Sequence, residues 1–162
     1  MKYAPIPSND EERLKVLHRL DILDTPPEPR FDDLTKEAVE KLKVPISMIS
    51  IIDKDREWFK SCQGLNVKES PRNISFCGHA MLASEIFIIE DTLKDERFRD
   101  NPQVMGKPFI RFYAGIALHE ALTNHVIGVF CIKDTRPRDM SLPEINIFLN
   151  IAKKAELQLN KR

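Results

Sequence analysis

Residues 112–133, FYAGIALHEALTNHVIGVFCIK, contain two apolar segments that are separated by a polar turn. The first segment covers 112–118 and the second covers 126–133, and neither contains a proline. Apolar runs of this length are typical of buried strands. Because the connection is short and includes the turn residues Thr123 and Asn124, we expect the two strands to pair antiparallel. These residues therefore predict an antiparallel sheet at the centre of the fold.

Three further segments have the length and composition of strands. Ile46–Ile52 is apolar on both faces and rich in β-branched residues, which indicates a central strand. The charged turn at 53–56 connects it to 57–62, so this pair is predicted to form a hairpin. Ile86–Ile89 is predicted to be an additional short strand. The polar segment 66–73 is predicted to be a loop.

Four segments carry helix signals. Ser8 and Glu11 have the spacing of a capping box, and so do Ser141 and Glu144, in which each side chain satisfies an amide of the first turn. Ser75 is predicted to cap a short helix through its hydroxyl group. The predicted helices are 9–22, 30–43, 76–83 and the segment from 142 to the C-terminus.

The composition excludes several classes of partner. The 162 residues fit one domain, which we expect to span 1–162 with a core at about 9–160. Lys and Arg together number 25, and so do Asp and Glu. The chain therefore lacks the excess of positive charge with which proteins bind nucleic acid or anionic lipid. The longest apolar run, Val126–Ile132, is far shorter than the about 20 residues of a membrane-spanning helix. Three cysteines, an odd number, favour a reducing compartment. We therefore expect a cytoplasmic protein that binds neither nucleic acid nor a membrane.

Six short motifs combine polar and aromatic residues near the ends of apolar strands, as the lining of a ligand pocket does. In chain order they are Ile22–Glu28 (ILDTPPE), Ser75–His79 (SFCGH), Asp95–Phe98 (DERF), Asn101-Pro102, Ile110–Gly115 (IRFYAG) and Ile127–Ile132 (IGVFCI). In these motifs the chain resembles the GAF domains found at the N-terminus of many bacterial sensor histidine kinases and diguanylate cyclases. The resemblance extends from about Asn9 to the end of the chain.

The resemblance implies an α+β fold with a central antiparallel sheet of five or six strands. The N- and C-terminal helices would cover one face, and a ligand pocket would lie on the other. The candidate ligand-binding residues are Phe76, Cys77, His79, Asp91, Phe98, Phe109, Arg111, Phe112 and Tyr113. The guanidinium of Arg111, placed where a strand begins, is suited to bind a carboxylate or phosphate in a bidentate manner. Alternatively, Arg111 pairs with Asp91, Asp95 or Asp134 and braces the preceding loop.

Cys77 and His79 form the closest pair of chemically reactive side chains in the sequence. A zinc site requires three or four ligands, and no further ligand follows at suitable spacing, so no metal site is predicted. The alternative is a structural role, with Cys77 as a small buried apolar residue and His79 hydrogen-bonded in a loop. A haem or tetrapyrrole is not supported, because the surrounding signature of phytochromes is absent and no histidine stands out as a haem ligand. The cofactor is therefore left unknown.

No catalytic constellation is identified in the sequence. We predict a sensory domain of a two-component or cyclic-di-GMP pathway that binds an unidentified small molecule and signals through a partner protein. The resemblance implies a homodimer formed through the terminal helices, whereas the apolar stripe of the last helix is explained equally well by packing on the sheet. One alternative is a thiol redox enzyme or sensor, similar to free methionine sulfoxide reductases, which would use Cys77 with Cys62 or Cys131. The other alternative is a dimerisation module without a ligand.

Overall fold

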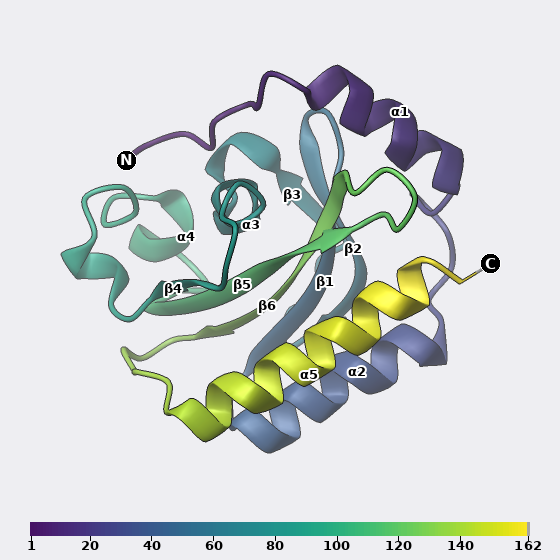
Figure 1. The fold of residues 1–162 in the computed structure, drawn as a ribbon. Helices are drawn as coiled ribbons and strands as arrows, with labels where there is room; N and C mark the ends of the chain where they lie inside the picture. The colour runs from purple at the N-terminus through teal and green to yellow at the C-terminus, as the bar shows by residue number, and fades with distance from the viewer. Residues whose placement is uncertain (162) are drawn as a thin grey trace.

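A six-stranded antiparallel sheet is the central element of the structure, as Figure 1 shows. The computed structural model describes residues 1–161. The strands lie in the order β3-β2-β1-β6-β5-β4, so the long apolar strands occupy the middle of the sheet. The strands are β1 (Ile46–Ile52), β2 (Arg56–Gln63), β3 (Glu69–Pro71), β4 (Phe87–Ile89), β5 (Phe112–His119) and β6 (Val126–Asp134). The helices are α1 (Asp10–Leu20), α2 (Pro29–Leu42), α3 (Phe76–Ala80), α4 (Pro102–Met105) and α5 (Leu142–Leu159). The predicted α+β class is confirmed.

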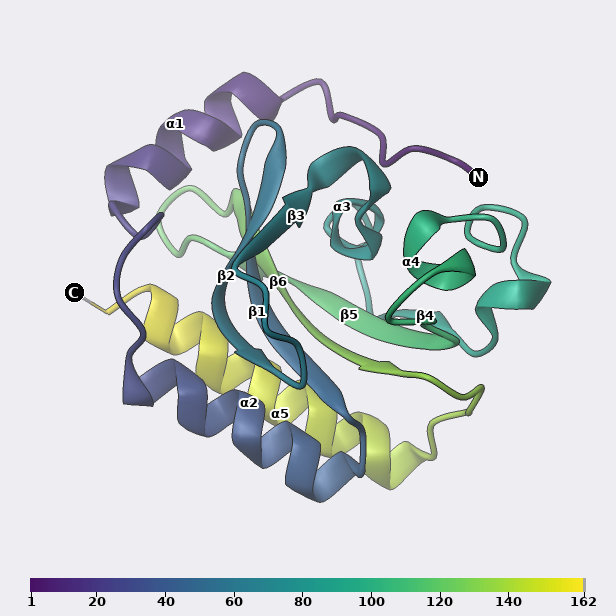
Figure 2. The same cartoon turned by 180° about the vertical axis from the view of Figure 1, so that it is seen from behind.

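The two long helices α2 and α5 lie side by side on one face of the sheet, which both views show (Figures 1 and 2). Each presents an apolar stripe at three- and four-residue spacing, as an amphipathic helix on a sheet requires. Phe31 of α2, Phe148 of α5 and Phe130 of β6 are completely buried between these layers. Burial of this apolar surface is the main stabilising contribution to the fold.

The opposite face of the sheet is covered by α3, α4 and the segments around them (Figure 2). A second apolar core lies here, separate from the first. It is built from Phe76 and Cys77 of α3, Phe98, and the side chains of Tyr113 and Cys131 that alternate inward from β5 and β6. The expectation that helices cover one face while the other face remains available for a pocket therefore holds, with short helices at the pocket side.

The helix α1 lies at one end of the sheet, beside the β1–β2 and β5–β6 turns (Figure 1). Its Asp10 carboxylate accepts two 2.9 Å hydrogen bonds from the guanidinium of Arg72 and one of 2.9 Å from Arg13. Burial alone would raise the pKa of Asp10, but these hydrogen bonds outweigh it and hold the pKa below its usual value. The predicted capping box at Ser8 is wrong, because the helix starts one residue later with Asn9 at the N-cap and no side-chain cap bond.

Two further predictions are corrected by the structure. The segment 66–73 is not all loop, because Glu69–Pro71 pairs with β2 as the edge strand β3. Three residues are too few to show a periodicity in the sequence, so this pairing carried no signal. The capping box of Ser141 and Glu144 is confirmed, but α5 ends at Leu159 rather than at the C-terminus. The part of that prediction that concerns Arg162 lies outside the described residues. Among residues 1–161, no helix is both long and apolar enough to cross a membrane.

Candidate functional site

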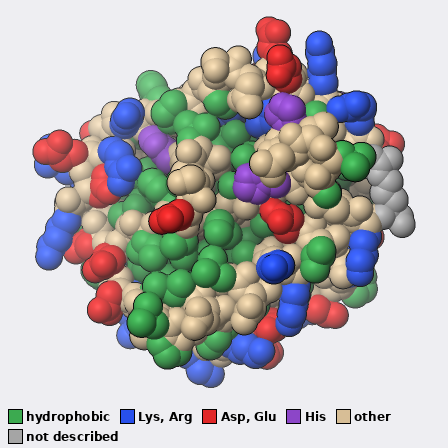
Figure 3. Space-filling view, in the orientation of Figure 1, with side chains coloured by type: hydrophobic (Ala, Val, Ile, Leu, Met, Phe, Trp, Pro, Cys, Tyr) green, Lys and Arg blue, Asp and Glu red, His purple; other side chains and the backbone are tan. Residues whose placement is uncertain are grey.

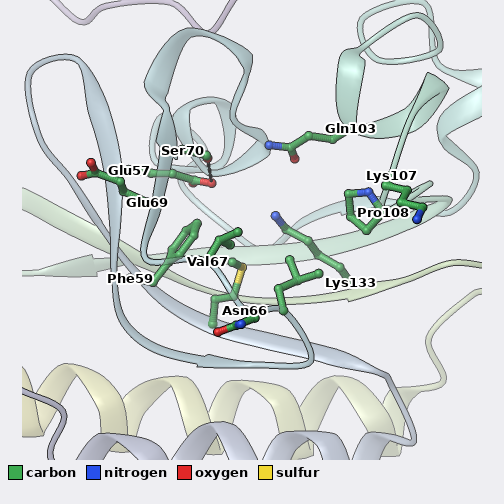
Figure 4. Close-up of a pocket in the computed structure, with 12 residues that line it drawn as sticks. Glu57, Phe59, Asn66, Val67, Glu69, Ser70, Gln103, Lys107, Pro108 and Lys133 are labelled. Carbon is green, nitrogen blue, oxygen red and sulfur yellow. Dashed lines mark hydrogen bonds between the residues drawn. The ribbon is translucent and has the colours of Figure 1, made fainter.

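A pocket of about 300 Å³ opens on the sheet face that carries α3 and α4 (Figure 4). Four elements bring polar side chains to it: Glu57 from β2, Ser70 from β3, Gln103 from α4 and Lys133 from β6. In Figure 4 these side chains point toward a common space. The pocket thus lies between the strands β3, β2 and β6 and the segment around α4.

Glu57 is completely buried, although it is an acidic residue on a strand. It has the same inward direction as Phe59 two residues later, because successive side chains alternate across a strand. One carboxylate oxygen, Oε1, accepts a hydrogen bond of 2.9 Å from the Ser70 hydroxyl group, since Glu57 and Ser70 are paired across β2 and β3. The other oxygen, Oε2, is buried and has no hydrogen-bond partner among residues 1–161. A buried acceptor without a hydrogen bond lowers the free energy of unfolding by about 1–3 kcal/mol.

Lys133 is 2% exposed and extends from the end of β6 into the pocket. Its ammonium nitrogen lies 5.6 Å from the centre of the Phe76 ring and 6.0 Å from that of Tyr113, within the range of cation–π attraction. Burial alone would lower the pKa of Lys133, but the negative fields of Glu57 and of the neighbouring cysteine sulfurs together outweigh it, and the pKa lies above its usual value. The amine therefore stays protonated. In Figure 4 no hydrogen bond joins it to another of the residues drawn.

The rest of the pocket wall is mostly apolar. Gln103 is half-buried, and its side chain reaches in from α4 toward Glu57 and Ser70 (Figure 4). The apolar wall residues are Met48, Phe59, Leu65, Val67 and Pro108, and the remaining polar ones are Asn66, Glu69 and Lys107. An apolar concavity with a few convergent polar groups is the usual form of a small-molecule site.

Three of the nine candidate residues from the sequence form an aromatic stack in the apolar core on the pocket face of the sheet. Phe76 stacks on Phe98 with 4.7 Å between ring centres, and on Tyr113 with 5.2 Å. All three are completely buried. Phe76 and Tyr113 contribute the ring faces next to the Lys133 ammonium, and none of the three is among the residues that line the pocket.

Cys77 and His79, the reactive pair of the sequence, make structural contacts. The Cys77 sulfur lies 3.7 Å from the Cys131 sulfur and accepts a hydrogen bond of 3.2 Å from the Tyr113 hydroxyl group. Burial raises the pKa of the Cys77 thiol well above its usual range. His79 Nε2 lies 3.2 Å from the carbonyl oxygen of Lys2, and burial lowers the pKa of its imidazole. These contacts match the structural role that the sequence left open for the pair.

The remaining candidates lie in the segment around α4 and at the start of β5. Asp91 caps a short turn of 3₁₀-helix by accepting a 3.1 Å hydrogen bond from the Leu93 amide. Arg111 donates to the carbonyl oxygen of Val104 at 2.8 Å and so braces the loop. The acceptor is a backbone carbonyl group, and an ion pair of the Arg111 guanidinium with Asp91, Asp95 or Asp134 is not observed among residues 1–161. The Phe109 ring is 44% exposed, and Phe112 is buried on the opposite, helical face of the sheet. The ligand-binding role of the nine residues stays a prediction.

The residues that sequence reasoning missed are Glu57, Ser70, Gln103 and Lys133. Strand alternation carried a signal for two of them, because Glu57 is in phase with Phe59, and Lys133 is in phase with Cys131. A charged residue in phase with buried neighbours is expected either at a site or at a strand end. The described chain holds no group of three or more His, Cys, Asp or Glu side chains that is arranged for a metal ion.

Comparison with known proteins places this geometry in a family. A family model described as GAF domain matches residues 26–159. A protein of Pseudomonas aeruginosa named cyclic di-GMP phosphodiesterase is 37% identical over 140 residues. The match covers 85% of this chain and 23% of that protein, so the chain spans less than a quarter of the length of this relative.

Solved structures with the same fold include GAF domains and an enzyme. The GAF domain of a phosphoenolpyruvate-protein phosphotransferase from Coxiella burnetii superposes with a TM-score of 0.64 at 17% identity, covering 93% of this chain and 95% of that one. A type II free methionine-R-sulfoxide reductase from Thermoplasma acidophilum superposes with a TM-score of 0.63 at 13% identity, covering 81% and 89%. At such identity the likeness is one of fold. The family match over most of the chain, on a six-stranded antiparallel sheet with a pocket opposite its long helices, shows that this chain belongs to the GAF domain family.

Proposed function

We propose that this GAF domain is a non-catalytic sensor that binds a small molecule in the pocket between Glu57 and Lys133. The observation that carries the proposal is the buried Oε2 atom of Glu57, which has no hydrogen-bond partner within residues 1–161. A folded chain rarely keeps a buried polar atom without a partner unless something else supplies the partner. A bound ligand would satisfy this atom and offset the cost of burying it.

A role in signalling is supported by the relative from Pseudomonas aeruginosa. That protein is named a cyclic di-GMP phosphodiesterase, and the region that matches this chain is 23% of it. We propose that this domain acts in the cytoplasm and passes its ligand state to an output in a signalling pathway through protein–protein contacts. A ligand shifts such an equilibrium only by its difference in affinity for the two states of the domain.

A second copy of this chain is the partner that the surface supports. On the helical face, α2 and α5 leave the edge of the sheet around β4 uncovered, and Ile86, Ile88 and Ile116 are only partly buried there. On α5, Leu142 is 77% exposed and Leu149 is 36% exposed. Figure 3 shows hydrophobic side chains gathered over this region between β5 and α5. We propose that a homodimer covers this apolar surface, because exposed apolar patches of soluble chains commonly mark interfaces.

The thiol redox alternative receives less support from the geometry. A redox thiol reacts as an accessible thiolate, whereas Cys77 and Cys131 are completely buried and burial raises the pKa of Cys62 to about 11. We therefore expect Cys77→Ser to leave ligand binding unchanged and to remove no reductase activity. Loss of a methionine sulfoxide reductase activity in a folded Cys77→Ser protein would favour the enzyme instead.

Native mass spectrometry of the purified protein and thermal shifts with a broad metabolite panel test the proposed function. We expect one class of compounds to raise the melting temperature, because a ligand that binds only the folded state stabilises it by mass action. Glu57→Gln should reduce that shift, whereas Glu85→Gln, an exposed acid outside the pocket, should not. A bare native mass together with no stabilising compound would favour a module without a ligand.

A further inference from the structure

We infer that the ligand of this pocket is a small amphoteric molecule with a protonated amine and a carboxylate, such as a free amino acid. This inference rests on the proposed function, since it names the ligand class of the same pocket. It follows from two buried groups of opposite charge that face one space without meeting each other.

The acidic half of the pocket requires a donor. Glu57 is 0% exposed, and only Oε1 is occupied, by the hydroxyl group of Ser70 at 2.9 Å. Oε2 has no partner among residues 1–161, so Lys133 does not reach it directly. A cationic N–H group is the strongest partner for a buried carboxylate, because it supplies both the hydrogen bond and the opposite charge.

The basic half of the pocket requires an acceptor. The Lys133 ammonium is 2% exposed and faces the rings of Phe76 and Tyr113 at 5.6 and 6.0 Å. Ring faces attract a cation, but they do not accept hydrogen bonds from its three N–H groups, whereas a carboxylate does. A ligand carboxylate near Lys133 would complete this half, and in Figure 4 the ammonium points into the pocket.

The charge balance of the pocket favours a ligand with no net charge. Of the four charged residues that line it, Glu69 and Lys107 are exposed to solvent, whereas Glu57 and Lys133 are buried and carry opposite charges. Glu69 is held at the surface by Arg56, with 2.7 Å between carboxylate and guanidinium, so Glu57 is the acid left for the ligand. A molecule with several phosphates would bring its anionic groups close to Glu57 and would be repelled there.

The size and walls of the pocket set the rest of the ligand. About 300 Å³ lies at the low end of ligand pockets, which suits a molecule of amino-acid size. Next to the polar groups, Met48, Phe59 and Val67 offer an apolar wall for a side chain. Gln103 reaches in from α4 and is placed to hydrogen-bond either polar end of the ligand (Figure 4).

Isothermal titration calorimetry tests the inference with three sets of probes on the full chain. The first set is glycine and the apolar amino acids as free L-amino acids, the second is their N-acetyl derivatives, and the third is their carboxamides. We expect at least one free amino acid to bind, and its two blocked derivatives to bind about tenfold weaker or worse, because each loses one charge-assisted hydrogen bond. Equal binding of a blocked derivative would overturn the inference.

Variants assign the binding to the two residues. Glu57→Gln should weaken the free amino acid at least about tenfold, and the fold should be retained, since the variant removes a buried charge without changing volume. Lys133→Met should have a similar effect. If Lys133→Met does not fold, the double variant Glu57→Gln with Lys133→Met is measured in its place, because it removes both buried charges together. Lys94→Met, on an exposed turn outside the pocket, is the control and should bind as the wild type does.

The outcomes separate this inference from the proposed function. If the thermal-shift panel shows that the wild type binds a nucleotide, a simple carboxylate or a simple amine, and calorimetry shows no binding of an amino acid, the ligand class is wrong and the sensor function stands. If it binds no compound of any class, both are wrong. If amino acids bind equally well to Glu57→Gln, they bind elsewhere, and the assignment to this pocket fails.

Discussion

The position of α1 against the sheet depends on a buried cluster of three charged residues, which are Asp10, Arg13 and Arg72. Arg72 precedes α3, and its bidentate contact with Asp10 joins α1 to the pocket side of the sheet. Arg13 is 1% exposed and Arg72 is 2% exposed, so neither guanidinium has water as an alternative partner. A buried charge cluster of this kind contributes specificity of position, and its removal is costly because the remaining charges stay buried.

Asp10→Asn is therefore expected to destabilise the domain by about 3 kcal/mol, because two buried guanidinium groups lose their counter-charge. Chemical denaturation of wild type and variant measures this difference. Glu37→Gln on α2 is the matched control, since its pairs with Lys41 and Lys154 lie at the surface, and we expect a change below about 1 kcal/mol. An equal effect of both variants would contradict the role of the buried cluster.

The same cluster predicts a dependence of stability on pH. The pKa of Asp10 in the folded protein lies below its value in the unfolded chain, which is about 3.9. The stabilisation by the carboxylate is therefore complete above that pH and is lost as the pH falls through the lower folded value. We expect the difference in unfolding free energy between wild type and Asp10→Asn to shrink below about pH 4. A difference that stays constant to lower pH would contradict the assignment.

At the scale of the elements, the ends of the helices show which local signals hold. Ser141 caps α5 in a complete capping box with Glu144, but Ser8 stands one position too early to cap α1. We expect Ser141→Ala to lower the unfolding free energy by about 1 kcal/mol, because an orphan amide of the first turn loses its acceptor. Ser8→Ala is the control and should be neutral in the same denaturation experiment. Destabilisation by Ser8→Ala would mean that the α1 cap is misplaced.

The long elements were predictable from the sequence, and the short ones only in part: β4 and α3 were expected near their observed positions, whereas β3 was not. Strands β1, β5 and β6 are apolar runs that only a central strand explains, and their positions agree with the prediction. The edge strand β3 is three residues long, and its pairing is set by contacts with β2 that no local pattern contains. The pocket depends on that pairing, because it brings Ser70 to Glu57. Sequence reasoning therefore placed the pocket on the face opposite the long helices, but four of the nine residues that it selected, Phe76, Cys77, Phe98 and Tyr113, are buried in the adjacent core.

At the scale of the whole molecule, the uncovered apolar surface beside α5 predicts a homodimer. We expect Leu149→Arg to shift the protein from dimer to monomer, because it would place a charge within the buried interface. Light scattering after size exclusion measures the mass of both forms. Leu122→Arg, at the 94% exposed tip of the β5–β6 turn, should leave the dimer intact. A monomeric wild type, or a dimer unaffected by Leu149→Arg, would show that this surface is not the interface.

The ligand pocket is the central claim of this account, and a crystal structure of the purified protein soaked with the tightest-binding free amino acid tests it most directly. We predict density for an occupant whose amine hydrogen-bonds Glu57 Oε2 and whose carboxylate hydrogen-bonds the ammonium of Lys133. The contrary result would be an empty site in which Glu57 and Lys133 form a direct ion pair. In that case the two buried charges satisfy each other, and the pocket has no role in sensing.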